Sequence, residues 1–407
     1  MANSLVTIDM ITREALRVAH EKSQFIGTVD RQYDSSFAKT GAKIGTALRV
    51  RKPNQYTRTT GSRVMDVQDQ SEQNGTITVA TQDHVDMRFN SAELALSIDE
   101  ISMRYIEPAV SVLVSGIESD FLAYATKATY NVAGTAGTAI ASLVAPGAAR
   151  AKLNQYLAPK DGNRAIQMDS VTMGGLVNGV AAYFAPNGDI SKQFREGMVA
   201  RTAMADYYEN ERIWSLTNNA DIVCTMAAAA AVTDGGSVMT MASLSAAPAT
   251  GAVFTVPGVY SCHPETKASL GSLQQYVVTT GTTTIQTVSP AIYLTGPRQN
   301  VCSAAGAQLT PASYDGTGLV PVFVGAATTT YAQPIMYHKE AFQFVTADLP
   351  LMDDAAKCVR RVQDGLSMRV WQASDIRNDE LLMRIDILYG MAALRPEWAC
   401  RMIGSAS

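Results

Sequence analysis

The first regular pattern along the chain is an amphipathic one near its start. Within residues 7–24, apolar side chains recur at helical spacing at Ile8, Ile11, Ala15 and Val18, while most charged residues fall off that stripe. Such spacing is typical of an α-helix with one buried face. The pattern predicts a helix that packs either on its own domain or on a partner, and it favours neither.

A longer apolar stripe occupies the region 108–131. Pro108 suits the first turn of a helix, and the stripe from Val110 to Ala128 predicts a helix about 35 Å long. A mixed layer should follow, with a helix near 148–157, a strand near 164–169 and a Gly-interrupted helix near 172–184.

Between these helical regions, residues 44–90 are polar and rich in Thr, Gln and Arg. Strand-like segments at 46–52 and 76–80, with a turn signal at Asn74-Gly75, predict a long β-hairpin with an extended polar tip. A hairpin alone cannot bury a core. The segment is therefore either a contact to neighbouring chains or a solvated loop.

Residues 224–333 change composition again. Thr, Ala, Gly and Val dominate, and charged residues are few. Strand-like pieces are separated by Gly and Pro, at 252–256, 275–279, 283–288 and 319–324. Because mixed helix and strand sequence lies on both sides, the pattern predicts an inserted all-β module, either a small barrel or a sandwich.

The chain then resumes strand character. Alternation at 366–370, a turn at 374–379 and alternation at 381–389 predict a β-hairpin. We expect Gly390 to allow a sharp change of direction and residues 398–403 to form a last short strand.

Composition narrows the class of protein. Charged residues make up 17% of the 407 residues, below the roughly 25% of ordinary domains, which favours a surface that meets other protein. The net charge of −4 argues against a chain-wide nucleic-acid footprint. The sequence has no apolar run of the kind that a membrane span or a signal peptide needs, so we expect neither. Five widely spaced cysteines predict free thiols in a reducing cytoplasm.

Candidate chemistry is sparse. The four histidines lack metal-ligand spacing, and the glycines of 174–179 lack the ending of a phosphate loop. Cys262-His263 could suggest a nucleophile pair, but adjacent strand residues face opposite sides, so a turn is the better interpretation. Asp353-Asp354 has no further clustered ligands. A triad that meets only in space leaves no sequence mark, but nothing points to one, so we predict no enzyme, no cofactor and no metal site.

Four short motifs follow one another along the chain, and their order is informative. They are FREGMVART at 194–202, QYVVTTGTTTIQTVSPAIYL within the β-module, YHKEAFQFV at 337–345, and Tyr389-Gly390 followed by Arg395-Pro396-Glu397. In this order they resemble the tailed-phage major capsid (coat) proteins, in the short-tailed branch with an inserted β-domain. The likeness runs through most of the chain, with the first third similar in layout more than in residues.

The resemblance implies an α+β fold of the Johnson type. It predicts an N-terminal arm, an extended loop, a peripheral domain with a long spine helix, an axial α/β domain and the inserted β-domain. The corresponding ranges are 1–43, 44–90, 91–150 with 334–362, 151–223 with 363–407, and 224–333.

The resemblance also implies a function. The chain should assemble with itself into hexamers and pentamers of an icosahedral shell around double-stranded DNA, located in the virion and assembled in the bacterial cytoplasm. Expected partners are a scaffolding protein, a portal protein at one vertex, non-specifically packaged DNA, and a decoration protein in some relatives; no membrane is implied.

Candidate contact residues follow from these expectations. Arg49, Arg51, Arg58 and Arg63 of the hairpin are candidates for intersubunit ion pairs, and Asp9 and Glu14 are candidates for scaffold contacts. The alternative from another class is a β-rich surface-binding or adhesion protein, in which the β-module binds the ligand.

Overall fold

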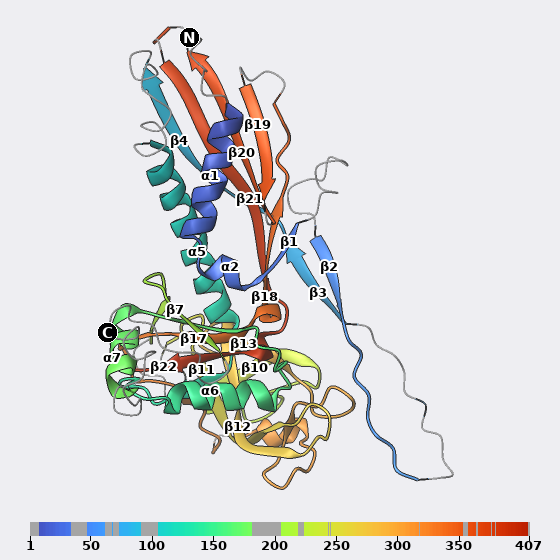
Figure 1. Cartoon of the computed structure of the whole chain (residues 1–407). Coiled ribbons are helices and arrows are strands. Elements are labelled where there is room, and N and C mark those ends of the chain that lie inside the picture. Colours follow the sequence, from blue (N-terminus) through green and yellow to red (C-terminus); the bar gives the residue numbers. More distant parts are fainter. Residues whose placement is uncertain are drawn as a thin grey trace. The chain divides into compact units, whose positions relative to one another are not determined.

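The computed structural model describes residues 8–33, 47–61, 67, 73–90, 105–180, 205–218, 224–242, 244, 246–316, 318–352, 357–363, 365–375, 377–378 and 380–405, and the account below concerns these residues. The chain divides into two compact units, each assembled from separate stretches of sequence. Unit 1 comprises Met1–Val50, Asn74–Phe121 and Phe342–Leu394; unit 2 comprises Arg51–Gln73, Leu122–Ala341 and Arg395–Ser407. Strands outnumber helices in both, so the fold is α+β (Figure 1).

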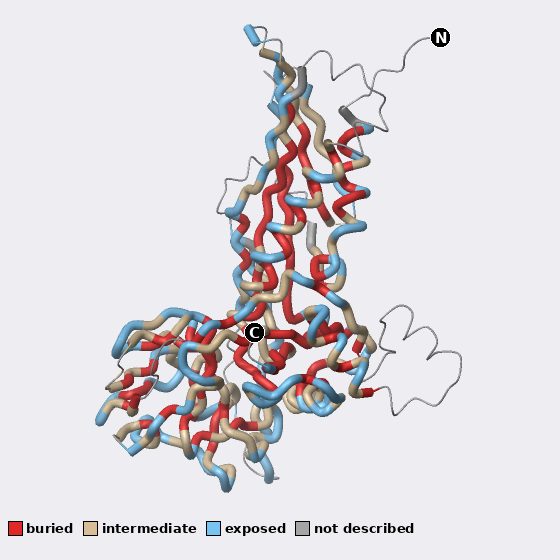
Figure 2. The backbone as a smooth tube through the Cα atoms, turned by 90° about the vertical axis from the view of Figure 1, so that its left-hand side faces the viewer, coloured by how far each residue is buried: buried red, intermediate tan, exposed pale blue. Residues whose placement is uncertain are grey.

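A six-stranded sheet forms the body of unit 1. Its strands are β1 (Asp30–Tyr33), β4 (Thr81–Asn90), β18 (Phe342–Ala347), β19 (Lys357–Gln363), β20 (Leu366–Asp375) and β21 (Glu380–Ala393). Their order is β1-β18-β21-β20-β19, with β4 also paired to β21. The hairpin of β20 and β21, closed at Asp375 and Glu380, confirms the strand alternation seen in the sequence. Figure 2 shows long buried runs along the strands of this unit.

Helices cover this sheet within unit 1. They are α1 (Ile8–Lys22), α2 (Phe25–Thr28) and the first part of α5 (Glu107–Ala128). Ile11, Ala15 and Val18 of the apolar stripe of α1 are buried, and the helix contacts β19 and β20, so this helix folds onto its own unit. The buried carboxylate of Glu118 on α5 accepts hydrogen bonds from the backbone N–H groups of Phe25 (2.7 Å) and Ile26 (3.3 Å). These contacts fix the start of α2 on α5.

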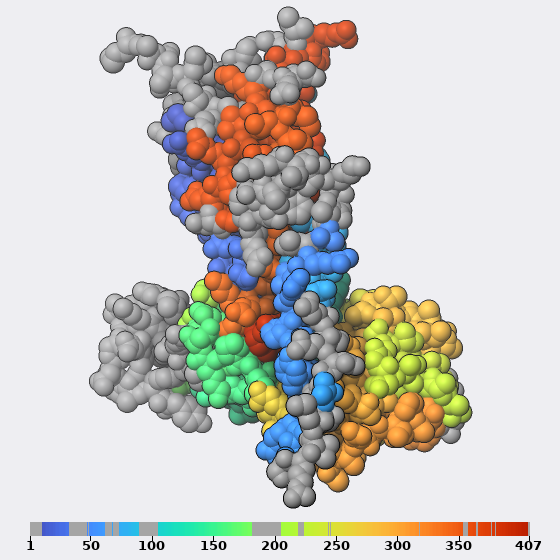
Figure 3. Space-filling view, turned by 90° about the vertical axis from the view of Figure 1, so that its right-hand side faces the viewer, coloured from blue at the N-terminus to red at the C-terminus, as the bar shows by residue number. Residues whose placement is uncertain are grey.

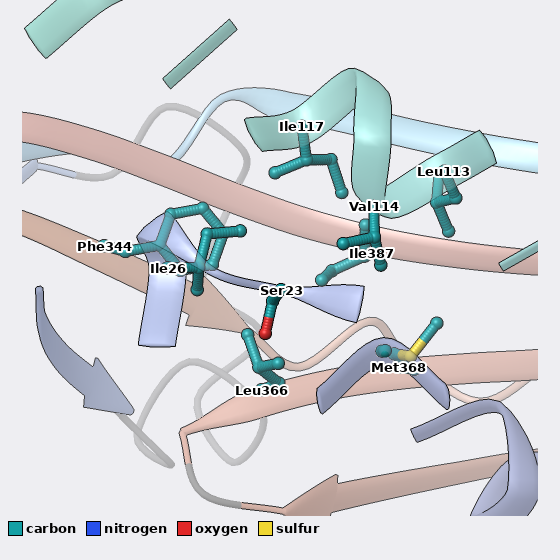
Figure 4. Close-up of a pocket in the computed structure, with 10 residues that line it drawn as sticks. Ser23, Ile26, Leu113, Val114, Ile117, Phe344, Leu366, Met368 and Ile387 are labelled. Carbon is teal, nitrogen blue, oxygen red and sulfur yellow. The ribbon is translucent and has the colours of Figure 1, made fainter. Parts of the chain in front are cut away.

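A small apolar recess remains among these helices and the sheet (Figure 4). Ile26, Ile117, Leu366 and Met368 contribute to its walls, and Ser23 is the only polar residue among its lining side chains. Without titratable or charged groups, the recess is a packing defect and not a site of chemistry.

Unit 2 contains a mixed five-stranded sheet. In order, its strands are β5 (Val132–Gly134), β22 (Ala399–Ile403), β17 (Ile335–His338), β6 (Arg164–Met168) and β7 (Asp206–Glu209). The helices α6 (Val144–Gln155) and α7 (Ser170–Val180) share a buried core with it. A Cβ at Gly179 would lie 1.6 Å from the Ala141 carbonyl oxygen, so the glycines of 174–179 include one required by close packing, as expected for a helix rather than a phosphate loop.

A seven-stranded sheet with its own core spans residues 225–323 of unit 2. Its strands are β9 (Thr225–Met226), β10 (Gly236–Ala242), β11 (Val253–Cys262), β12 (Ser269–Gly281), β13 (Ile285–Ile292), β14 (Val301–Cys302) and β15 (Val322–Phe323). Phe254, Tyr276 and Tyr314 are fully buried in its core, and the Tyr276 and Tyr314 hydroxyls hydrogen-bond at 2.9 Å. The short turn η4 (Pro311–Tyr314) carries Tyr314.

The side-chain amide of Gln275 links this sheet to the five-stranded one. It accepts from the Val132 backbone N–H at 2.8 Å and donates to the Val132 carbonyl at 3.1 Å. The amide thus pairs with β5 as the backbone of another strand would. Val253, Val277 and Ile403 form an apolar cluster beside this contact.

Two small sheets complete the described structure. β2 (Ala47–Lys52) pairs with β3 (Gln73–Thr78), and β8 (Ser215–Thr217) pairs with β16 (Thr330–Ala332). Residues 53–61 leave β2 without regular structure and lie at the surface (blue in Figure 3). The two predicted strands thus pair with each other. None of the described helices combines the length and apolar character that a membrane crossing requires.

Three sequence-based expectations are corrected here. Asn74-Gly75 lies inside β3 and forms no turn. Residues 81–90, expected as part of the extended hairpin, form β4 and pair along β21. The hairpin β20–β21, expected with 151–223, pairs with β18 and β4 in unit 1, and only the segment from Arg395 onwards joins unit 2.

Gly390 brings a fourth correction. The strand β21 continues through this residue to Ala393, so no change of direction occurs there. A Cβ at Gly390 would lie 2.4 Å from the Thr78 carbonyl oxygen. Glycine is needed because another backbone passes close to β21 at this point. The motif of residues 194–202 lies outside the described residues.

Candidate assembly site

Two of the sequence motifs meet in unit 2. The 3₁₀ turn η5 (Lys339–Ala341) contacts the 3₁₀ turn η6 (Pro396–Trp398). The Arg395 backbone N–H donates to the Ala341 carbonyl at 3.2 Å, and the Arg395 guanidinium lies 4.0 Å from the Glu340 carboxylate. We call this contact the motif junction.

Trp398 occupies the centre of the motif junction. Its indole N–H donates to the Tyr156 carbonyl at 3.0 Å, while the Arg395 guanidinium carbon lies 4.1 Å from its ring centroid. The edge of the His338 ring meets Trp398 with centroids 5.5 Å apart. A stacked cation and a satisfied N–H hold the indole in one orientation.

His338 ties the motif junction to the loop before β6. The side chain is buried; its Nε2 lies 3.1 Å from Asp161 Oδ1, and its Nδ1 accepts from the Glu340 N–H at 3.3 Å. That arrangement assigns the proton to Nε2, which donates to Asp161. Burial alone would raise the pKa of Asp161, but hydrogen bonds from Asn163 and His338 lower it to about 2.

Glu397 belongs to the turn η6, between Pro396 and Trp398. Burial raises the pKa of Glu397, and the positive charges of Lys52 and Arg395 oppose that rise. Lys52 is the last residue of β2 and belongs, like Glu397, to unit 2. The junction offers no activated nucleophile; it orients backbone turns and charges.

The other half of the C-terminal motif lies in unit 1. Tyr389 stacks on Phe344 with centroids 5.6 Å apart, and its hydroxyl donates to Asp83 at 2.9 Å. Tyr389 is fully buried, and this burial raises the pKa of its hydroxyl. Tyr389-Gly390 thus serves packing of the six-stranded sheet.

The predicted arginines lie apart from the motif junction. Arg49 and Arg51 are exposed on β2, two residues apart and so on one face of the strand. Arg58 is exposed in the segment that follows. Arg63 lies outside the described residues.

The two predicted scaffold-contact residues lie on α1. Asp9 lies within the helix, but its side chain is outside the described part of the structure. Glu14 accepts hydrogen bonds from Arg17 at 3.0 and 2.6 Å, in a pair that remains largely exposed.

The sequence did not reveal Asp161 or Trp398 as members of the motif junction. The YHKEAF and RPEW motifs were both visible, but their contact spans more than fifty residues of intervening chain and could not be read from spacing. Within the described residues, no group of three metal-ligating side chains is assembled.

Comparison with known families adds an independent observation. Residues 217–404, which contain the seven-stranded sheet and both halves of the motif junction, match the family model of the P22 coat protein. This match, over just under half of the chain, supports a major capsid protein of a tailed phage. The match gives no support to the surface-binding alternative. No curated protein matches the chain.

Solved capsid structures align with this chain along most of its length. A structure of Mycobacterium phage Che8 is 10% identical, covers 93% of this chain and 90% of its own, and has a TM-score of 0.46. The capsid structure of cyanophage P-SCSP1u is 10% identical, covers 93% of this chain and 87% of its own, and has a TM-score of 0.46. The mature capsid of bacteriophage PhiM1 is 12% identical, covers 94% of this chain and 87% of its own, and has a TM-score of 0.44. Since these TM-scores lie below 0.5, the support for a capsid protein comes from the family model of residues 217–404.

Proposed function

We propose that this capsid protein builds an icosahedral shell of hexamers and pentamers around double-stranded DNA, and that the β2–β3 hairpin reaches over a neighbouring subunit. The observation that supports this is the largely exposed segment 53–61 beyond β2, which contains exposed Arg58 and is preceded by exposed Arg49 and Arg51. A polar segment of this kind stabilises little within its own chain and is suited to contacts between copies.

The arginines of the hairpin are proposed as the intersubunit contacts. Exposed ion pairs contribute about 0–1 kcal/mol each. Many copies in one shell multiply such small terms. The role proposed for the chain is structural and non-enzymatic.

The proposed domain layout follows the same family. In it, the seven-stranded sheet is the inserted β-domain, α5 is the spine helix of a peripheral domain, and the five-stranded sheet belongs to the axial domain. The separate core of the seven-stranded sheet supports the first of these assignments.

Further partners remain proposals from the family. They are a scaffolding protein during assembly in the bacterial cytoplasm, a portal protein at one vertex, packaged DNA inside and a decoration protein outside. Asp9 and Glu14 are proposed as acidic contacts for basic scaffold residues. The exposure of the Glu14–Arg17 pair is compatible with an exchange of partners.

The test is electron microscopy of the chain expressed together with the scaffolding gene of its phage. Closed shells are expected for the native chain. The double variant Arg49→Glu, Arg58→Glu should stay folded but fail to close shells, because two of the four proposed contact charges are reversed. Arg377→Glu, at the exposed turn between β20 and β21, is the matched control and should assemble normally.

The outcomes test the three parts of the proposal separately: the shell, the hairpin arginines and the scaffold contact. Small rings or monomers from the native chain would contradict the icosahedral shell. Normal shells from the double variant would leave the shell intact and overturn the role of the hairpin arginines. A Glu14→Lys variant that recruits scaffold as the native chain does would overturn the scaffold contact.

A further inference from the structure

Two cysteines lie together at one edge of the seven-stranded sheet. In the antiparallel pair β11–β14, Tyr260 faces Cys302 and Ser261 faces Val301. The Cys262 N–H continues this register by donating to the Asn300 carbonyl at 3.1 Å. Because side chains alternate along a strand, Cys262 and Cys302 share one face as diagonal neighbours.

The two thiols also lie close enough to interact. The Cys302 thiol lies 3.8 Å from the Ser261 carbonyl oxygen, and, together with burial, Cys302 contributes to raising the pKa of the Cys262 thiol. Both residues are buried, with exposed fractions of 2% and 0%. Val259 and Val301 point to the opposite face, into the core of the sheet. The pair is therefore enclosed without being part of that core.

Lys267 closes the turns around the pair. Its ammonium group donates to the carbonyls of Pro264 at 2.7 Å, Pro297 at 2.6 Å and Gln299 at 3.3 Å. The turn after Cys262 and the turn before Cys302 are thereby held against each other. Because diagonal neighbours are about 7–8 Å apart between Cα atoms, closing a bond requires the two strand ends to approach each other, and these turns are where that movement would occur.

We propose that Cys262 and Cys302 form a dithiol that can be oxidised to a disulfide joining β11 to β14. The oxidant is a low-molecular-weight disulfide such as oxidised glutathione. One cysteine thiolate attacks the glutathione disulfide and releases one glutathione thiol. The second cysteine then attacks the mixed disulfide and releases the other. The protein loses two protons and two electrons, and both glutathione sulfurs gain them.

The redox state of the surroundings determines whether the pair is reduced or oxidised. A capsid protein assembled in a reducing cytoplasm keeps both thiols, and the same protein released into an oxidising medium can close the bond. The bond would close a covalent loop containing β12 and β13. It would act inside one subunit and so differs from a link between subunits.

Burial sets the rate of this reaction. It raises the pKa of Cys262 to about 12, with the nearby Cys302 adding to the rise and Lys267 opposing it. The thiolate is the reactive form. Oxidation should therefore be slow at pH 7 and accelerate about tenfold per pH unit up to pH 9.

The experiment uses the full chain, incubated with oxidised glutathione at pH 7, 8 and 9, with and without urea below the unfolding transition. Free thiols are then blocked with N-ethylmaleimide in denaturant, and the intact mass is measured. Before oxidation all five thiols should be blocked. After oxidation about three should be blocked, with a tryptic link between peptides 213–267 and 299–339.

Variants assign the bond. Cys262→Ser and Cys302→Ser should each abolish the link. Cys224→Ser is the matched control, because Cys224 shares the 213–267 peptide with Cys262 and is also buried, but contacts Met241. That variant should retain the link.

Three results would overturn the proposal. The first is five blocked thiols under every condition, including pH 9 with urea. The second is glutathione attached to either cysteine without closure of the bond. The third is a link that involves Cys224, Cys358 or Cys400 and survives the loss of Cys302.

Discussion

Each unit has a buried arginine on a sheet strand, and the two guanidinium groups have different hydrogen-bond partners. In unit 1, Arg369 on β20 faces Asp386 on β21. Its Nε donates to that carboxylate at 3.0 Å, and Nη2 binds the second oxygen. In unit 2, Arg401 on β22 is equally buried, but its partner among the described residues is the Gly251 carbonyl at 2.9 Å.

The difference shows what each arginine contributes. Nε and Nη2 of Arg401 have no hydrogen-bond partner within the described structure, and burial lowers the pKa of this residue. A bidentate carboxylate compensates the burial of a guanidinium, whereas one carbonyl compensates only part of it. We infer that Arg369 and Asp386 are strongly interdependent, and that Arg401 stabilises the fold little.

The largest effect should come from breaking the pair in unit 1. Asp386→Leu leaves Arg369 buried without its carboxylate and should lower the free energy of unfolding by about 3–5 kcal/mol. Urea denaturation of the unassembled chain measures this. The double variant Asp386→Leu, Arg369→Met should recover most of the loss. A single variant as stable as the native chain would remove the basis of the comparison.

A smaller effect is expected in unit 2. Arg401→Met removes a poorly compensated charge but also the hydrogen bond to Gly251, so the free energy of unfolding should change by no more than about 1 kcal/mol in either direction. The same denaturation experiment applies. A loss as large as that of Asp386→Leu would show that Arg401 is compensated as fully as Arg369.

A third prediction concerns Asp161, the partly exposed carboxylate of the motif junction. Its pKa of about 2 lies below the ordinary value of 3.8. The folded state therefore favours the ionised form, a stabilisation present above about pH 4 and lost as pH falls towards 2. Across that pH window, the native chain should lose its higher free energy of unfolding relative to Asp161→Asn. Since solvent screens the site, the advantage should be below about 1 kcal/mol. A difference that does not vary with pH would contradict this assignment.

The smallest effect is expected at the surface of α1. Glu14→Gln weakens its exposed pair with Arg17 and should change the free energy of unfolding by less than about 0.5 kcal/mol. Thermal unfolding monitored by circular dichroism can measure it. A larger loss would mean that exposed pairs in this chain carry weight comparable to Arg401.

Periodicity predicted the elements that bury one continuous face. α1, α5 and the hairpin β20–β21 lie where the apolar spacing placed them, within a few residues. The strands of the seven-stranded sheet were found but were longer than expected, as for β11, which extends to Cys262. The polar and small residues near strand ends carry too little periodicity to mark a boundary.

Long-range contacts account for what the sequence could not reveal. Asn74-Gly75 has strong turn propensity, yet pairing with β2 keeps it in a strand. Gly390 looks like a bend in sequence, but the approach of the Thr78 backbone explains it. The three residues of β5 are too few to show any pattern. The contact of Asp161 with His338 joins positions 177 residues apart.

The place of β22 in its sheet has a consequence for biosynthesis. β22 lies between β5 and β17, although it is the last of the five strands to leave the ribosome. During synthesis β5 therefore has no neighbour in this sheet on its β22 side, and β17 waits with one side unpaired. The five-stranded sheet is completed only when residues 399–403 insert as a strand between β5 and β17. Until then the nascent chain carries two open strand edges, the form of intermediate that chaperones protect from aggregation.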